Sequence, residues 1–366
     1  MNPEPQPEPA RSQPSACEAC LRHAALLGAL AGHIEHRRGD RQKLAALLAL
    51  PDDALARAVG AVGVTAPDPP PVRPGSAICR HDPGYPRSLA ELDGAPAVLH
   101  LGGQSSRALE LMTGQSVAIV GARQPTDYGR QVAFGLSAAL ASTGVCIVSG
   151  LALGIDTAAH LGALSGSGPT LAVMPGGVDV AYPAGARALH ARLTAIGAVV
   201  SEMPSGAQPR RWSFVARNRI IAALTRVTVV VEARARSGSL ITAGYARDLG
   251  REVAALPGPV TSDRSDGTNA LIRDGAQLVR DARDVLDLLY GVGTETLVRE
   301  PRLPAHLRTL LGLVRAGHDT PGGLVAAGMD VQHALAGLAE LELAGCVRRG
   351  LSGRYIPCRP HRHAVA

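Results

Sequence analysis

The segments SVAIVGAR at residues 116–123 and VCIVSGLALGID at residues 145–156 decide the fold of this chain. Each begins as a short apolar run rich in valine and isoleucine and then turns at a glycine. The stretch between them, Tyr128–Ser142, is long enough for a helix of about four turns. A buried strand, a glycine turn and a helix that leads to the next strand form the repeating unit of a parallel β-sheet.

The same alternation continues as far as residue 256. The predicted strands are Val117–Val120, Val145–Val148, Thr170–Met174, Ala198–Val200, Val227–Val231 and Glu252–Leu256. Near-continuous apolar strands indicate a sheet covered on both faces, and another helix is expected over Asp156–Ser165. Residues 75–292 therefore predict an α/β fold with an extended Rossmann-like parallel sheet, in which ligands bind past the carboxyl ends of the strands.

Smaller units are expected on either side of this sheet. Residues 1–16, rich in proline, glutamate and serine, predict a disordered tail, and residues 17–70 predict a small helical domain of the SAM or helix-hairpin-helix kind. Residues 303–358 predict a winged-helix domain of the DML1-like type, because three helical patterns precede two strand candidates around Ser352-Gly353. The apolar faces expected in this last domain are formed by Leu307, Leu310, Leu311 and Val314 and by Val331, Leu335, Leu338 and Leu341.

The composition excludes some classes of protein. Hydrophobic residues make up 46% of the chain and aromatic residues 2%, so aliphatic side chains must fill the core. The first residues lack the basic and apolar regions of a signal peptide, and no segment has the apolar length of a membrane span. We therefore expect a cytoplasmic protein without a membrane partner. Its net charge of +6 is compatible with a polyanionic partner.

The six cysteines of the chain predict no metal site. Only Cys17 and Cys20 form a CxxC pair, and no second pair follows at the spacing of zinc ligands. The remaining cysteines are interpreted as ordinary reduced thiols of a cytosolic protein.

The turn after the first predicted strand contains Gly121 and Arg123. Glycine lets the backbone approach a ligand, and the following helix directs free N–H groups toward an anion. A dinucleotide site needs the pattern GxGxxG, which this turn lacks, so no cofactor is expected. Arg123 is either a phosphate clamp or an ordinary surface arginine.

Asp156 and His160 follow the second strand and lie one helical turn apart. Such a pair can act as a general acid and base, but no nucleophile or metal partner completes the site. We therefore expect Asp156 to cap the helix and His160 to pack beside it. The chain is accordingly predicted not to be an enzyme.

Three further loops at the same edge carry residues whose backbone N–H groups can bind an anion. Gly150 ends the second strand, Gly176-Gly177 ends the third, and Ser237-Gly238-Ser239 opens the helix after Val227–Val231. Such N–H groups bind phosphates, although the serines are equally typical of a helix N-terminus without a ligand.

The strongest functional signal is RRWSFVARNR at residues 210–219. It contains four arginines, Asn218, the only tryptophan of the chain and Phe214, one of two phenylalanines. Guanidinium groups hold phosphates and an aromatic ring stacks on a base. This composition therefore favours single-stranded nucleic acid over a purely structural cluster.

Taken together, these motifs resemble the DprA/Smf family, the DNA-processing proteins of bacterial natural transformation. The resemblance covers residues 78–290, with Ala122 where the family commonly has serine and Val215 where it commonly has proline. The matching blocks are Asp82–Pro86, Pro96–Leu99, Val120–Arg123, Ser149–Ala152, Gly154–Asp156, Ala159-His160, Gly177, Tyr182-Pro183, Ser201-Glu202, Phe214, Arg217–Ile221, Ser237–Ser239, Pro257-Gly258, Gly267–Asn269 and Leu271-Ile272.

The resemblance implies a protein that binds single-stranded DNA in a basic pocket of the Rossmann-like domain, protects incoming DNA and helps to load RecA during transformation and recombination. It also implies competence as the setting, a homodimer through that domain, and RecA and the single-strand-binding protein as partners. Residues and resemblance together predict these DNA-binding positions: Gly121, Arg123, Gly150, Gly176, Gly177, Arg210, Arg211, Phe214, Arg217, Asn218, Arg219, Ser237, Gly238 and Ser239.

Two other functions compete with this prediction. Nucleotide-cleaving phosphoribohydrolases share such a sheet and a Pro-Gly-Gly loop, but Pro175-Gly176-Gly177 continues here with Val178-Asp179 and lacks their glutamate. A transcription factor would read duplex DNA through the winged helix, but its third helix carries Glu340 and Glu342 and few basic residues.

Overall fold

The computed structural model describes residues 15–37, 41–61, 63–69, 71–292, 304–343, 346–350 and 353–357. Its internal contacts divide the chain into a first unit that ends at Thr294 and a second unit that begins at Glu295. The predicted tail lies, up to residue 14, outside the described residues. None of the described helices combines the length and apolar character needed to cross a membrane.

A nine-stranded sheet forms the centre of the first unit, in the order β1-β2-β6-β5-β4-β3-β7-β8-β9. The strands from β3 to β9 run parallel, as predicted, whereas β1 and β2 add an antiparallel edge beside β6. The strands are β1 (Ala77–Cys79), β2 (Val98–Gly102), β3 (Ser116–Val120), β4 (Cys146–Ser149), β5 (Thr170–Met174), β6 (Val199–Ser201), β7 (Val227–Val230), β8 (Glu252–Ala255) and β9 (Gln277–Leu278).

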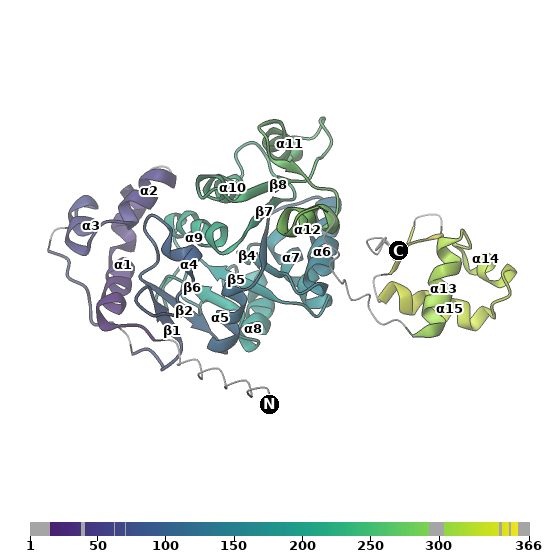
Figure 1. Ribbon diagram of the computed structural model, residues 1–366, viewed down its shortest axis with the longest axis horizontal. Coiled ribbons are helices and arrows are strands. Elements are labelled where there is room, and N and C mark those ends of the chain that lie inside the picture. Colours follow the sequence, from purple (N-terminus) through teal and green to yellow (C-terminus); the bar gives the residue numbers. More distant parts are fainter. Residues whose placement is uncertain are drawn as a thin grey trace, which may run out of the picture. The chain divides into compact units, whose positions relative to one another are not determined.

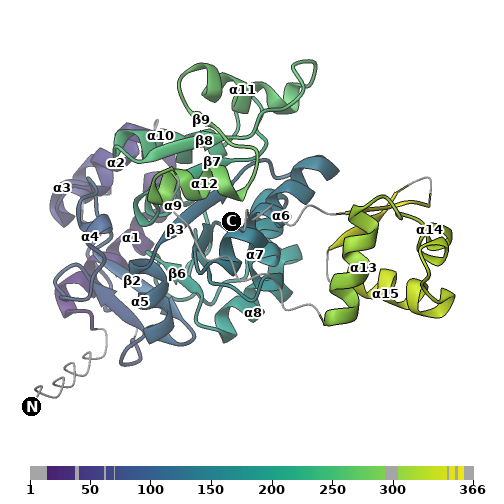
Figure 2. The same ribbon diagram turned by 45° about the vertical axis from the view of Figure 1, so that its right-hand side comes forward.

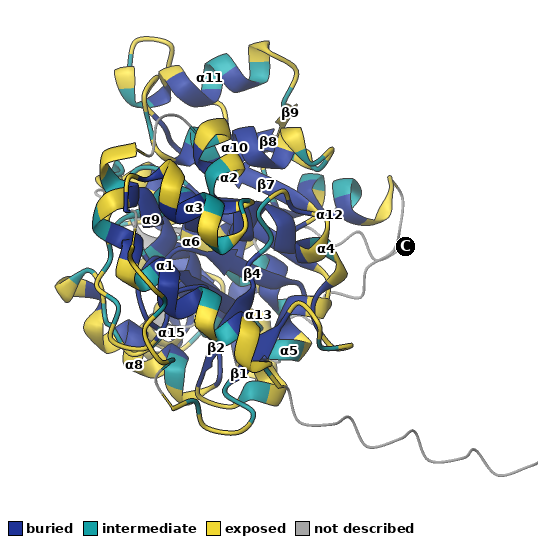
Figure 3. Cartoon of the chain, turned by 90° about the vertical axis from the view of Figure 1, so that its left-hand side faces the viewer, coloured by how far each residue is buried: buried dark blue, intermediate teal, exposed yellow. Residues whose placement is uncertain are grey.

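Helices cover both faces of the sheet (Figures 1 and 2). Alternate residues of the central strands β3 and β4 therefore enter different cores. In β3, Val117 and Ile119 pack under helices α6, α7 and α12, whereas Ala118 and Val120 pack under α5, α8, α9 and α10. In Figure 3, strands β4 and β7 are buried among helices that carry many of the exposed residues. The helices are α4 (Arg87–Ala90), α5 (Ser105–Thr113), α6 (Asp127–Ser142), α7 (Ile155–Ser165), α8 (Arg187–Ala195), α9 (Arg211–Leu224), α10 (Ser239–Asp248), α11 (Asp266–Arg273) and α12 (Ala282–Tyr290).

Three N-terminal helices pack within the same unit as the sheet: α1 (Glu18–Arg37), α2 (Arg41–Leu48) and α3 (Asp52–Ala58). Ile34 and most of their leucines share one buried cluster with Trp212 of α9. The indole N–H of Trp212 donates to the carbonyl oxygen of Ala31 at 2.9 Å. The N-terminal helices therefore pack against α9 in a core of their own, beside those of the sheet.

The second unit contains α13 (Ala305–Arg315), α14 (Pro321–Ala326) and α15 (Val331–Leu343), followed by a hairpin of β10 (Val347–Arg349) and β11 (Tyr355–Pro357). The Thr320 side chain accepts from the N–H of Gly323, and Asp330 accepts from the N–H groups of Gln332 and His333. These caps fix where the second and third helices begin.

One predicted apolar face of this unit needs correction. Val331 and Leu335 of α15 are about half exposed, with relative exposures of 51% and 50%. Ala334, Leu338 and Leu341 instead turn toward α13, because this three- and four-residue spacing keeps them on one side of the helix. The four expected residues of α13, from Leu307 to Val314, are all buried.

Candidate nucleic-acid interface

Helix α9 joins the loops at the carboxyl edge of the parallel strands. It follows β6, so its N-terminus reaches the edge where β3, β4, β5 and β7 end. Arg217 bonds to the ends of β4 and β5, and Asn218 donates to the carbonyl oxygen of Gly238 at 3.4 Å. The predicted segment 210–219 is thus the element around which the other loops are arranged.

The order of the strands reverses between β3 and β7. From β3 the chain adds β4, β5 and β6 on one side, and it then returns to add β7 and β8 on the other side. In Rossmann-like sheets, ligands bind at such a switch point, with a phosphate at the N-terminus of the next helix. Here the carboxylate of Glu232 takes that position: it accepts from the backbone N–H of Thr126 at 3.1 Å and from its hydroxyl at 2.7 Å. Thr126 is the N-cap of α6. The chain's own carboxylate therefore fills the usual phosphate position.

Two aromatic side chains form a pair at the same edge of the sheet. The rings of Tyr182 and Phe214 meet edge to face, with centroids 5.5 Å apart and planes at 63°. The guanidinium carbon of Arg123 lies 5.2 Å from the centre of the Phe214 ring, a cation–π contact. Phe214 is half-buried and Tyr182 is 42% exposed, so each ring is partly packed against the protein and partly accessible to solvent.

The predicted site thus contains a group of outward-facing residues. Arg123, Arg210 and Arg211 are exposed, and Arg210 and Arg211 open the helix that carries Phe214. We call Arg123, Tyr182, Arg210, Arg211 and Phe214 the aromatic rim. Tyr182 was absent from the predicted positions, although Tyr182-Pro183 was one of the matching blocks and was the available signal for it.

Arg217 lies inside the protein, contrary to its expected part in holding phosphate. Its guanidinium donates to the carbonyl oxygens of Gly150 and Val173, both at 2.6 Å. Burial lowers the pKa of Arg217 to about 10, while the nearby carboxylate of Asp156 opposes that shift. The side chain holds the ends of β4 and β5 against α9.

Arg219 is also enclosed, and it forms an ion pair with Glu202. The two N···O distances are 2.6 Å and 3.0 Å, and the side chains are 1% and 7% exposed. A second bond runs to the carbonyl oxygen of Gly94 at 2.8 Å. The Glu202 carboxylate raises the pKa of Arg219 against the opposite effect of burial. Its guanidinium is therefore committed to an internal partner.

Several glycines of the predicted site are required by packing. A side-chain carbon on Gly121 would lie 2.7 Å from Ile155, and one on Gly176 would lie 2.6 Å from the carbonyl oxygen of Ala207. The N–H of Gly177 donates to the same Ala207 oxygen at 2.9 Å. The N–H of Gly150 donates to Asp156 at 3.2 Å. The N–H groups of Gly150 and Gly177 thus already have partners inside the protein.

The serine loop opens a helix, as expected. Gly238 is the N-cap residue of α10, and the hydroxyls of Ser237 and Ser239 lie 2.8 Å apart. Asn218 fixes this loop to α9 through Gly238. Ser239 is buried and Gly238 is exposed.

The prediction that Asp156 caps helix α7 is wrong, whereas the prediction that His160 packs nearby is confirmed. The N-cap of α7 is Gly154, whose φ of 89° favours glycine, so the predicted cap at Asp156 is wrong. Asp156 instead accepts from the N–H groups of Gly150 and Ala152, and burial raises its pKa. His160 is fully buried against Thr170 at 2.7 Å, as predicted, and burial lowers its pKa to about 3.

The sequence suggested that the CxxC pair has no further ligands nearby, but the structure shows otherwise. The fold brings Cys79 and His81 beside Cys17 and Cys20, and the four ligand atoms lie within 4.8 Å of one another. Cys79 is the last residue of β1, an edge strand that was not predicted from the sequence, and His81 follows this strand.

The fold and the rim define a Rossmann-like α/β protein whose usual phosphate position is filled by its own glutamate. Residues 76–290 match the family model of the DNA recombination-mediator protein A, and the chain belongs to this family.

Relatives agree with this assignment. The chain is 43% identical to the DNA processing protein DprA of Streptococcus pneumoniae over 205 residues, 56% of this chain and 71% of that one. It is 37% identical to protein Smf of Escherichia coli over 295 residues, 76% of each. With a DprA-type protein of Mycobacterium tuberculosis the identity is 44% over 237 residues, which span 65% of this chain and only 61% of that protein.

Two solved structures share the fold at 32% sequence identity. The DprA structure from Streptococcus pneumoniae superposes with a TM-score of 0.57 and covers 73% of this chain and 95% of that one. The DNA processing protein A of Helicobacter pylori, whose structure concerns its binding of single-stranded DNA, gives a TM-score of 0.52 over 56% of this chain and 92% of that one.

Proposed function

We propose that the chain binds single-stranded DNA at the aromatic rim. The observation that carries this proposal is the position of Arg123 over Phe214, 5.2 Å from the ring centre, at an open edge of the sheet. A ring stacks on an unpaired base, and guanidinium groups beside it neutralise the neighbouring phosphates. In a duplex the bases are already stacked on one another, so the rim favours single strands.

The roles within segment 210–219 then divide by burial. Arg210 and Arg211 reach solvent and contribute phosphate contacts, together with Arg123. Arg217 and Arg219 hold the helix in place by internal bonds. Asn218, bonded to Gly238, fixes the serine loop beside the bound strand.

The protein acts by binding, without catalysing a reaction on DNA or nucleotides. Asp156 and His160 are buried and bonded to internal partners, so neither reaches a ligand at the rim. Asp179, the carboxylate that follows the Pro-Gly-Gly loop, accepts from the N–H of Gly206 at 2.9 Å. Incubation with nucleoside monophosphates should therefore release no free base, and its release would favour a phosphoribohydrolase instead.

Titration of a fluorescent oligo-dT with the full chain tests the binding proposal. Each phosphate contact adds about 0.7 to the magnitude of the slope of log affinity against log salt for single strands. Three arginine contacts at the rim predict a slope near −2 by this rule, as an order of magnitude. Binding that does not change between low and high salt would rule out phosphate contacts, and the same sequence as a duplex serves as the comparison ligand.

We also propose the wider role that the family resemblance suggests: the protein protects incoming DNA, helps to load RecA in the cytoplasm during transformation, and acts as a homodimer through the Rossmann-like unit. A direct test is RecA assembly on single-stranded DNA already covered by single-strand-binding protein. The chain should accelerate assembly, and the Phe214→Ala variant should not. Equal rates with and without the wild-type chain would contradict the loading role.

A further inference from the structure

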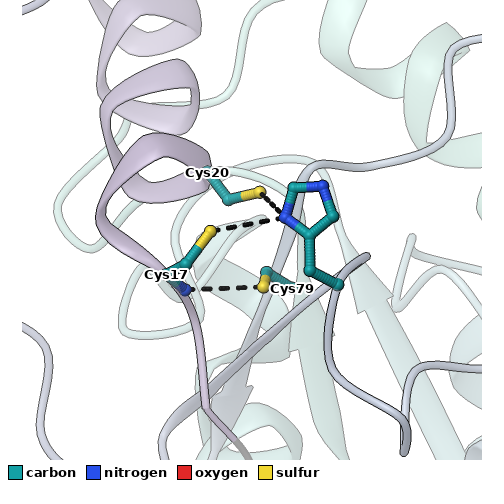
Figure 4. Close-up of side chains that lie close together, drawn as sticks. Cys17, Cys20 and Cys79 are labelled. Atoms are coloured by element: carbon teal, nitrogen blue, oxygen red, sulfur yellow. Dashed lines mark hydrogen bonds between the residues drawn. The ribbon is translucent and has the colours of Figure 1, made fainter.

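Cys17, Cys20, Cys79 and His81 form a compact cluster far from the aromatic rim in the sequence. Cys17 lies just before α1 and Cys20 lies in its first turn, whereas Cys79 ends β1 and His81 follows it. Figure 4 shows the three thiols turned toward a common centre beside an imidazole ring. Two segments separated by more than fifty residues thus meet at one point.

The distances in this cluster match those of a tetrahedral metal site. The sulfur atoms of Cys17 and Cys20 both lie 3.4 Å from Nδ1 of His81. Zinc bonds of about 2.3 Å to sulfur and about 2.0 Å to nitrogen place neighbouring ligand atoms about 3.5 Å apart for S···N and about 3.8 Å apart for S···S. All four ligand atoms here lie within 4.8 Å of one another, so small side-chain rotations suffice to surround an ion.

We propose that these four residues bind one Zn²⁺. Three thiolates and one imidazole form a common set of ligands for structural zinc, and soft sulfur donors disfavour Mg²⁺ and Ca²⁺. The backbone N–H of Cys17 points to the sulfur of Cys79 at 3.4 Å, which is the type of outer-shell hydrogen bond that supports a thiolate ligand. Because the protein supplies all four ligands, the site is structural and has no open position for substrate.

The zinc ion would connect the N-terminal helices to the edge of the sheet. Ser15, two residues before Cys17, already bonds to this edge: its carbonyl oxygen accepts from Cys79 N–H at 3.1 Å, and its own N–H donates to Asp82 at 2.9 Å. Cys20 and Cys79 are buried, whereas Cys17 and His81 are exposed. The ion therefore reaches its site from solvent through the exposed ligands and links the start of α1 to the end of β1.

Metal content of the full chain tests the site. The protein is expressed with zinc in the medium, purified under reducing conditions without a metal-affinity tag, and analysed by mass spectrometry of the elements. We expect about one zinc per wild-type chain and its loss in both Cys17→Ser and His81→Ala, since three ligands hold zinc far more weakly. The matched controls, Cys146→Ala and His33→Ala, remove a thiol and an exposed histidine outside the cluster and should keep the metal.

Cobalt gives a readout that does not depend on the folding of a variant. The chelated wild-type chain is titrated with Co²⁺ alone and should develop visible bands of tetrahedral cobalt and near-ultraviolet absorption of thiolate-to-cobalt charge transfer, both reversed by added Zn²⁺. Chelation should also speed hydrogen exchange in residues 15–37 and 77–82, with little change around β4 and β7.

Two results would overturn the proposal. One is a folded, fully reduced chain that contains no zinc and gives no thiolate-to-cobalt absorption. The other is a metal-free chain in which thiol titration and mass spectrometry find a disulfide among Cys17, Cys20 and Cys79, since the cluster would then be a redox-active or structural disulfide. Zinc bound equally by wild type and the Cys17→Ser and His81→Ala variants would place the metal elsewhere and contradict it as well.

Discussion

The two ends of segment 210–219 carry the same residue type in opposite environments. At the start of α9, Arg210 and Arg211 are exposed beside Phe214. One or two turns later, Arg217 and Arg219 are buried and bonded to main-chain oxygens and to Glu202. One short run of sequence thus contains both the surface that meets a ligand and the bonds that hold this surface in place.

This difference shows that charge alone does not identify a DNA contact. An exposed arginine contributes attraction that salt screens, whereas a buried arginine contributes to stability because its loss leaves polar partners unsatisfied. Substitutions at the inner positions should therefore change folding, and substitutions at the outer positions should change binding. Four measurements test this separation, from the largest expected effect to the smallest.

Replacing Arg219 by Met should lower the free energy of unfolding by about 3–5 kcal/mol, because Glu202 is left as an unpaired buried charge. Urea denaturation followed by circular dichroism measures the change. The double variant Arg219→Met with Glu202→Gln is the matched control and should recover much of the loss. A stable Arg219→Met variant that fails to bind oligo-dT would show instead that this arginine contacts DNA.

Replacing Arg217 by Met should cost about 2–3 kcal/mol of stability, since the carbonyl oxygens of Gly150 and Val173 lose their donor. One guanidinium nitrogen, Nη1, donates to both carbonyl oxygens, and Nε donates to Oδ1 of Asn218. Arg217→Lys can replace the Nη1 bonds but not the Nε bond, so it should restore only part of the loss. Full recovery in the lysine variant would mean that the bond to Asn218 adds little to stability.

Replacing Phe214 by Ala should weaken oligo-dT binding by about 1–3 kcal/mol, the usual contribution of one ring stacked on a base. Fluorescence anisotropy at fixed salt measures it. Phe134→Ala is the control, because Phe134 is the other phenylalanine and lies 40% exposed on α6, away from α9. If the Phe214→Ala and Phe134→Ala variants bind oligo-dT with equal affinity, Phe214 does not contact the DNA.

Replacing Arg123 or Arg211 by Ala should give the smallest change, a salt slope reduced by about 0.7 for each residue. Arg192, exposed in the last turn of α8, is the control, because that end of the helix faces the amino ends of the strands. Arg192→Ala should leave the slope as it is. An unchanged slope for Arg123→Ala and Arg211→Ala would mean that the rim arginines do not touch phosphates.

The sequence predicted the central sheet because its strands are buried on both faces and therefore read as continuous apolar runs. It did not predict β1, β2 or β9. Strands β1 and β9 are short and lie at the two edges of the sheet, and β2 pairs with β6 across a long separation in the chain. His100 interrupts the apolar run of β2, so neither alternation nor a continuous run was visible there.

The site was predicted as a set of residues but not as an arrangement. Trp212, Ala216 and Ile220 are spaced four apart and mark the buried face of α9, which also carries Arg219. The arginines interspersed along the segment mask this periodicity in the sequence. The partner of Arg219 and the ring beside Phe214 belong to other loops, so only the folded chain could identify Glu202 and Tyr182. For the same reason, local spacing did not connect the CxxC pair with Cys79 and His81.

The indole of Trp212 gives this chain a built-in optical reporter. Trp212 is the only tryptophan, it is fully buried, and its N–H binds a carbonyl oxygen of the helix that begins beside Cys17 and Cys20. Two residues later on α9, Phe214 opens to solvent. Intrinsic fluorescence can therefore follow, in one unlabelled sample, both the release of α1 and the arrival of a DNA strand. A red shift would accompany exposure of the indole, and quenching without a shift would accompany base stacking nearby.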